Sequence, residues 1–148
     1  MEITEQLKEI GELLRTQDNR ITESPMFCVQ VNDRVHGLDK DYGDGIEWID
    51  LDDVESGIQP APENPDETKL TAFGYRDNWK TVLVCFTEEG CKEHLRQNQH
   101  NYRYYDGFRI YVESFYRCPE MKAVREFLMT LDKPLKSNKL EEVDKNNI

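Results

Sequence analysis

The sequence predicts an α+β protein with a mostly antiparallel sheet of four to five strands and about three helices packed chiefly on one face. Two observations predict this class. Residues 81–86 form a short apolar run that leads at once into a helical segment. Residues 108–116 alternate between apolar and polar side chains before a second helical segment. Strand, helix, strand and helix therefore follow one another across residues 78–131.

The run at residues 81–86 is apolar on both strand parities, which predicts a central strand covered on both faces. Thr87 follows it and offers a hydroxyl as a helix N-cap. Glu88 and Glu89 place negative charge on the first turn, where the helix dipole favours it. A surface helix is therefore expected to begin after Thr87 and to end near Asn98.

The second strand and helix are read from residues 108–131. Phe108, Ile110 and Val112 share one strand face, and Pro119 suits the first position of a helix. Four apolar residues of this helix recur at i, i+3, i+4 and i+7, which predicts a stripe that faces the core. They are Val124, Phe127, Leu128 and Leu131.

The first half of the chain adds a helix and three strands. Apolar residues recur at helical spacing through residues 5–15, with Thr4 as the candidate cap. Residues 27–36 alternate as a strand with one face on a core and one in water. A tight turn at positions 32 and 33 of this run is the alternative. Residues 47–51 are expected to pair with this strand, and residues 70–75 form another.

Length and composition predict one folded domain over residues 1–131. Residues 52–67 contain three prolines and few apolar residues, so they are expected to form a long, mobile acidic loop. Residues 132–148 are polar and are expected to form a disordered tail. No apolar run is long enough to span a membrane, and the acidic N-terminus lacks a signal-peptide core, so a cytoplasmic protein with free thiols is expected.

Negative charge is concentrated in one segment. The chain has a formal net charge of −11. Residues 39–67 hold eleven acidic residues and one lysine, a net charge of −10. Such a field repels nucleic acid phosphates and attracts basic surfaces. We therefore expect no direct nucleic acid binding, and a protein partner with a basic groove.

No catalytic or metal motif stands out. Cys85, Cys91, His94 and His100 are ligand types close in sequence, but their spacing departs from zinc sites. Residues 39–50 approach a calcium loop but have Asp where the sixth position requires Gly. No nucleophile elbow or phosphate-binding loop occurs. The sequence thus predicts no cofactor and no metal, and an enzyme is the less favoured interpretation.

Four blocks of sequence carry a resemblance to known proteins. The first comprises residues 29–31 and 34–39 with Tyr42 and Trp48, and the second comprises residues 85–91 with Asn98, His100 and Asn101. The third comprises residues 109–114 with Tyr116 and Arg117, and the fourth comprises residues 124–128. Together they resemble a group of small uncharacterised accessory proteins of tailed bacteriophages and prophages.

The resemblance covers most of residues 26–131. No activity is known for the group, so it implies only a setting, the cytoplasm of a host cell. Small acidic phage proteins of this type often inhibit a host defence enzyme.

The leading hypothesis is a non-enzymatic phage protein that inhibits a host nucleic-acid-processing defence complex, of the anti-CRISPR or anti-restriction type. Carboxylates would stand in for phosphates on the partner's basic surface, and an aromatic and a basic residue would anchor the rim. The expected partner-binding residues are Asp39, Asp41, Asp44, Asp50, Asp52, Asp53, Tyr104 and Arg109.

Two alternatives stay open. One is a small enzyme or ligand-binding protein with a pocket around His100, Arg109 and Glu113. The other is a homo-oligomeric regulatory protein of the phage, for which a homodimer is the simplest form.

Overall fold

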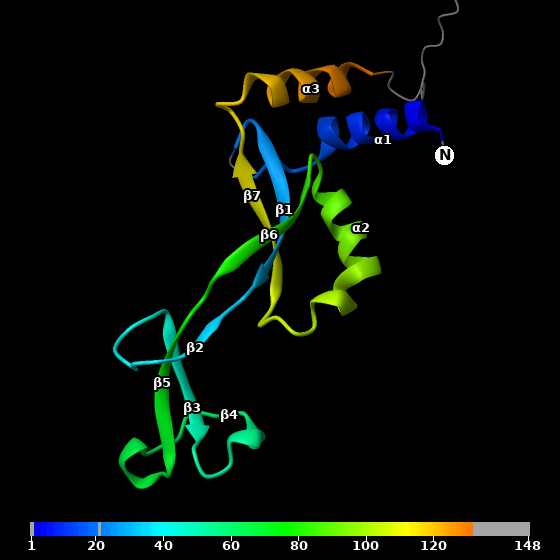
Figure 1. The fold of residues 1–148 in the computed structure, drawn as a ribbon. Coiled ribbons are helices and arrows are strands. Elements are labelled where there is room, and N and C mark those ends of the chain that lie inside the picture. The colour runs from blue at the N-terminus through cyan, green and yellow to red at the C-terminus, as the bar shows by residue number, and fades with distance from the viewer. Residues whose placement is uncertain (1, 21, 132–148) are drawn as a thin grey trace, which may run out of the picture. The chain divides into compact units, whose positions relative to one another are not determined.

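The computed structural model describes residues 2–20 and 22–131. The described chain has three α-helices and two antiparallel sheets, so the predicted α+β class is confirmed (Figure 1). The helices are α1 (Ile3–Thr16), α2 (Glu88–Asn98) and α3 (Pro119–Thr130). The strands are β1 (Pro25–Asn32), β2 (Val35–Leu38), β3 (Gly45–Asp50), β4 (Ile58–Gln59), β5 (Leu70–Arg76), β6 (Trp79–Cys85) and β7 (Phe108–Ser114).

The strands form two sheets where the sequence predicted one. A three-stranded sheet has the order β6-β1-β7, and a four-stranded sheet has the order β2-β5-β3-β4. The predicted strand at residues 27–36 is divided at positions 33 and 34 into β1 and β2, which join different sheets. β3 pairs with β5 and β4, so the predicted pairing of residues 47–51 with the first strand is wrong.

The chain divides into two compact units. The helical unit comprises Met1–Gln30, Thr81–Asn101 and Arg109–Ile148, and the sheet unit comprises Val31–Lys80 and Tyr102–Phe108. The single domain over residues 1–131 stays a prediction, and the predicted tail at 132–148 lies outside the described residues.

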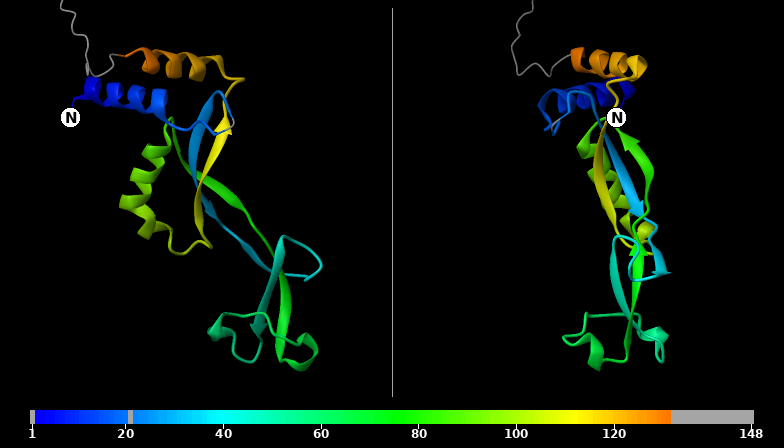
Figure 2. Two further views of the ribbon diagram at one scale, coloured as in Figure 1. Left: turned by 180° about the vertical axis from the view of Figure 1, so that it is seen from behind. Right: turned by 90° about the vertical axis from the view of Figure 1, so that its left-hand side faces the viewer.

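In the helical unit, α1 and α3 lie side by side (Figures 1 and 2). A Cβ at Gly11 would lie 2.1 Å from the carbonyl oxygen of Leu128, so only glycine permits this approach. Arg15 Nη1 donates hydrogen bonds to the carbonyl oxygens of Met129 at 2.8 Å and Leu131 at 3.2 Å. A cation is favourable there, because the last carbonyl groups of a helix lack intrahelical partners.

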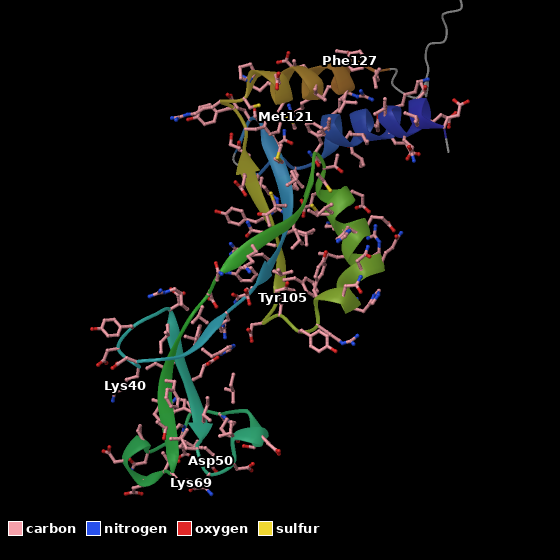
Figure 3. All side chains as sticks on the ribbon, viewed as in Figure 1. Lys40, Asp50, Lys69, Tyr105, Met121 and Phe127 are labelled. Atoms are coloured by element: carbon pink, nitrogen blue, oxygen red, sulfur yellow. The ribbon has the colours of Figure 1, made fainter. Side chains whose placement is uncertain are left out.

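The predicted core stripe of α3 is only partly correct. Leu128 is buried, but Val124 and Phe127 are exposed, Phe127 by 60% (labelled in Figure 3). Arg125 is buried in their place. The close approach of Leu128 to Gly11 sets the rotation of α3 about its axis, and this rotation turns Phe127 outward.

The predicted roles of β1 and β6 are reversed. β6 was expected in the centre, but it is an edge strand with Val82 and Val84 exposed. β1 is central, and all but one of its residues are buried. Its polar Gln30 is buried because it pairs on both sides, donating to Thr81 at 3.1 Å and accepting from Arg109 Nε at 2.9 Å.

In the sheet unit, no α-helix occurs among the described residues (Figure 2), and the four-stranded sheet has exposed or half-buried residues on both faces. The predicted loop at residues 52–67 contains β4 and the 3-10 turns η1 (Val54–Ser56) and η2 (Pro65–Glu67). A further 3-10 turn, η3 (Gln99–Tyr102), follows α2. Within the described residues, no helix combines the length and apolarity needed to cross a membrane.

Candidate functional site

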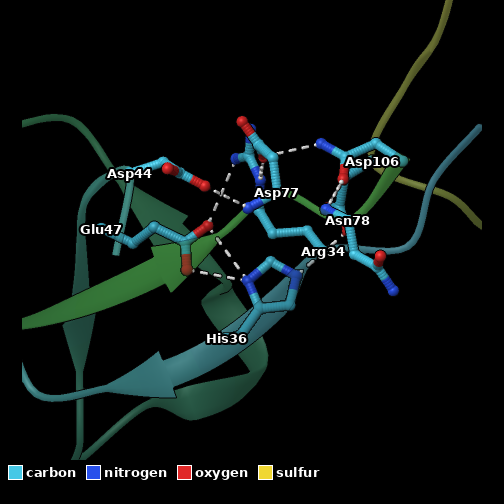
Figure 4. A network of polar contacts seen from close by, with 8 residues as sticks. Arg34, His36, Asp44, Glu47, Asp77, Asn78 and Asp106 are labelled. Carbon is cyan, nitrogen blue, oxygen red and sulfur yellow. Dashed lines mark hydrogen bonds and ion pairs between the residues drawn. The ribbon is translucent and has the colours of Figure 1, made fainter. Parts of the chain in front are cut away.

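A buried carboxylate is the centre of a polar network in the sheet unit (Figure 4). The side chain of Glu47 on β3 is only 3% exposed. His36 Nδ1 on β2 lies 2.8 Å from Glu47 Oε2, and Arg34 Nη1 lies 3.6 Å from Oε1. The other ring nitrogen of His36 lies 3.1 Å from Asp106 Oδ2. Two basic side chains thus offset the cost of burying Glu47.

The hydrogen bond to Glu47 raises the pKa of His36 above its usual value, against the effect of desolvation, and Asp106 raises the pKa further. An imidazolium between two carboxylates donates from both nitrogens and has no lone pair for accepting a proton. Both ring nitrogens of His36 face carboxylates, so this side chain joins β2, β3 and the 102–108 segment.

The network continues through Asp77 at the end of β5. Asp77 Oδ1 accepts hydrogen bonds from Arg34 Nε and from Asn32 Nδ2, each at 2.7 Å. Asn32 is buried, and its Oδ1 accepts from the backbone N–H of Asn78 at 3.0 Å. The Arg34 guanidinium also lies 3.8 Å from the centroid of the Tyr75 ring. These contacts hold the ends of β1, β2 and β5 together, and they engage the side chains of Asn32, Arg34 and Asp77 in hydrogen bonds with one another.

Three of the six predicted aspartates lie in the turn between β2 and β3. Asp39 and Asp41 are exposed, and Asp39 Oδ1 accepts from the backbone N–H of Asp41 at 2.9 Å. Asp44 is exposed too, but its Oδ2 accepts from the backbone N–H of Asp77 at 2.7 Å. Asp44 therefore fastens the turn to the end of β5, and Asp39 and Asp41 are the better placed for a partner.

The other three aspartates lie at the opposite end of β3. Asp50 is 8% exposed, its Oδ1 accepts from the backbone N–H of Asp52 at 2.9 Å, and its Oδ2 lies 3.2 Å from Lys69 Nζ. The bond from Asp52 lowers the pKa of Asp50, against desolvation, and Lys69 lowers the pKa further. Asp50 therefore has a structural role, while Asp52 and Asp53 are exposed.

The exposed aspartates thus form two groups separated by one strand. β3 has six residues, and a strand of that length spans about 20 Å. Figure 3 shows Lys40 of the turn at one end of β3 and β5, with Asp50 and Lys69 at the other. We call Asp39 and Asp41 the turn group, and Asp52 and Asp53 the distal group.

The two predicted rim residues lie in different units. Tyr104 belongs to the sheet unit, is 83% exposed, and stacks with Arg103 at 4.8 Å. Arg109 belongs to the helical unit, where its guanidinium lies 4.6 Å from the centroid of the Tyr111 ring. Tyr104 therefore shares a unit with the aspartates, and Arg109 does not.

The residues of the alternative pocket make separate contacts. Arg109 bonds to Gln30, and Glu113 Oε2 lies 3.6 Å from the buried thiol of Cys28. His100 is exposed in η3. Across the described part of the chain, no cluster of three or more His, Cys, Asp or Glu residues is placed to hold a metal ion.

Sequence reasoning missed the network around Glu47. Its one signal was an acidic residue between the apolar residues Ile46 and Trp48 of a predicted strand. A partner for Glu47 could not be named, because His36 lies opposite it only through the pairing of β2 and β3 with β5.

Comparison with known proteins leaves the family open, since no family model, curated protein or solved structure matches the chain significantly. The resemblance to phage accessory proteins therefore stays a prediction.

Proposed function

We propose that this chain is a non-enzymatic binding protein that covers a basic, nucleic-acid-binding surface of another protein. The observation that carries the proposal is the pair of exposed aspartate groups at the two ends of β3. The sheet unit contains fourteen acidic residues and six Lys or Arg residues, a formal net charge of −8. Such a surface attracts basic protein and repels nucleic acid.

The spacing of the two groups suits this role. The six residues of β3 cover about 20 Å, which is several times the spacing of about 3.4 Å at which charges recur along the helix axis of each nucleic acid strand. β3, paired with β5 and β4, lies between the two groups. Binding would therefore block phosphate contacts on the partner without any chemical step.

The resemblance to phage accessory proteins supplies the setting of the proposal. The partner would be a nucleic-acid-processing defence complex in the cytoplasm of a bacterial host, of the CRISPR or restriction type. The conformation of His36 favours this reading over an enzyme, because its two ring nitrogens face Glu47 and Asp106.

The test is a pull-down with the tagged full chain from the lysate of a bacterium with CRISPR and restriction systems, at low and high salt. We expect a nucleic-acid-binding protein at low salt and its loss at high salt, because screening shortens the reach of exposed charges. The variant Asp39→Asn/Asp41→Asn/Asp52→Asn/Asp53→Asn should weaken this binding at least about tenfold.

A matched control changes four exposed acids of the helical unit: Glu5→Gln/Glu9→Gln/Glu120→Gln/Glu126→Gln. It alters net charge by the same amount, so it separates local docking from overall charge. The proposal is wrong if both variants weaken binding equally, or if the four aspartates can be replaced without effect.

A further inference from the structure

One face of the four-stranded sheet is apolar between the two aspartate groups. Strand pairing sets Ile46 opposite Gly74, and Trp48 opposite Ala72 on β5 and Gln59 on β4. Residues directly opposite one another point to the same face. On β2, Val35 lies opposite Arg76 and Leu38 opposite Gly74. We call this the apolar face; its apolar side chains are Val35, Leu38, Ile46, Trp48, Leu70 and Ala72.

The reverse face is the one that carries the polar network. Glu47 lies opposite Phe73, and Gly45 opposite Tyr75. His36 and Arg34 contact Glu47 and Tyr75, which places them on this reverse face as well. The network of Arg34, His36 and Glu47 therefore lies on the reverse face, while Asp50, which pairs with Lys69, lies at one end of the apolar face.

The apolar face is open. Val35 is 45% exposed and Ile46 is 50% exposed, and Trp48, Leu38, Leu70 and Ala72 are half-buried. A sheet face of this composition is ordinarily covered by a helix or a second sheet. The described residues of the sheet unit supply neither.

The turn group borders this face directly. A Cβ at Gly74 would point to the apolar face and would lie 2.3 Å from the carbonyl oxygen of Tyr42 and 2.4 Å from that of Asp39. The backbone of residues 39–42 therefore lies over the end of the apolar face. Asp50, which precedes the distal group, lies opposite Leu70 and so belongs to the same face at its other end.

We propose that the apolar face docks a basic amphipathic helix of the partner protein. The apolar stripe of that helix would lie along Ile46 and Trp48, and Lys or Arg residues near its two ends would meet the turn and distal groups. A helix rises 1.5 Å per residue, so about 13 residues span the roughly 20 Å of β3, the strand that lies between the groups. The inference rests on the proposed function and names the surface and the partner's shape.

Charge argues against a second copy of this chain as the occupant. Two sheet units with a net charge of −8 each would meet with their aspartate groups close together. Like charges across an interface are unfavourable. A helix with basic ends removes that repulsion and buries the same apolar side chains.

The test uses two synthetic helical peptides of about 14 residues with identical lysines at both ends. One has a leucine stripe, and the other has glutamine in place of every leucine. We expect the leucine peptide to bind the full chain at least about tenfold more tightly. In methyl NMR spectra, it should shift Ile46 and Val35 and leave Ile49 and Ile58 of the reverse face unchanged, since Ile49 pairs with Ile58 there.

Substitutions give an independent readout. Val35→Thr/Ile46→Thr should reduce binding of the leucine peptide to the level of the glutamine peptide. The control Val82→Thr/Val84→Thr changes two residues of similar exposure on β6, 42% and 48%, and should have no effect. Threonine is common in β-strands, so these variants should fold. The methyl NMR experiment uses the unaltered chain and therefore does not depend on the folding of any variant.

Equal binding of the two peptides would overturn the inference, as would methyl shifts on the reverse face alone. A dimer of the free chain that Val35→Thr/Ile46→Thr abolishes would overturn it in favour of a second copy. If the lysate partner depends on the four aspartates while these peptide results are negative, the proposed function stands and this inference fails.

Discussion

At the scale of single residues, polar side chains decide what is buried in the sheet unit. Glu47 and Asp50 are buried on a six-residue strand, while Ile46 is half exposed. His36 and Lys69 hold these two carboxylates in place. The sequence predicted Asp50 as a partner-binding residue. It could not show the structural role of Asp50, because that role depends on Lys69, which directly precedes β5.

The Glu47–His36 pair predicts a pH dependence of stability. Folding raises the pKa of His36 above the usual histidine value of about 6.5. The stability that protonated His36 contributes is therefore present below that usual value and is lost as pH rises through the raised pKa. The free energy of unfolding of the unaltered chain should exceed that of His36→Gln most at about pH 6. The excess should shrink as pH rises above the usual histidine pKa.

The difference should be below about 1 kcal/mol, because the His36 side chain is 40% exposed and water screens the pair. Urea unfolding at several pH values measures it. Glu47→Gln is the control, since it removes the main cause of the raised pKa. An excess that grows with pH would contradict this account.

At the scale of elements, the sequence predicted which helices and strands occur better than it predicted which of them are central and buried. The N-cap of α2 is confirmed, with Thr87 Oγ1 accepting from the backbone N–H of Gly90 at 3.0 Å. Such a cap depends only on neighbouring residues. The central position of β1 and the edge position of β6 could not be predicted from the sequence. The polar Gln30 of β1 is buried because it forms hydrogen bonds with Thr81 and Arg109, which are distant in sequence.

Because the turn between β2 and β3 packs closely against Gly74, we predict that the sheet unit needs glycine at this position for its stability. In Gly74→Ala the new methyl group would meet two carbonyl oxygens of the turn, at 2.3 and 2.4 Å, so the backbone must move. We expect a loss of more than about 2 kcal/mol in the free energy of unfolding, measured with urea.

Gly57→Ala is the matched control. Gly57 has a φ of 75° and nothing within 4 Å of an added Cβ, so only backbone strain applies. With a ψ of −156°, Gly57 lies in a backbone region that essentially only glycine adopts, and the strain of alanine there costs about 1–3 kcal/mol. A loss for Gly74→Ala well below that for Gly57→Ala would show that the turn does not press on β5 as described.

At the scale of the whole molecule, charge patterning was the feature that sequence alone made visible. The −10 segment lies within a unit of net charge −8, so the local field persists after folding. The apolar face could not be predicted, because Val35, Ile46 and Trp48 come together only through the register of β5. Six aspartates were predicted for the site, and the carboxylates of two of them, Asp44 and Asp50, bind groups next to the ends of β5. The other four are exposed: Asp39, Asp41, Asp52 and Asp53.

The central claim is that this chain and nucleic acid compete for one basic surface. Displacement of labelled nucleic acid from the recovered partner, followed by fluorescence anisotropy as the full chain is added, tests it most directly. We predict complete release by the unaltered chain, and at least about tenfold more protein needed for the four-aspartate variant. A ternary complex that retains the nucleic acid at saturating protein would contradict the account.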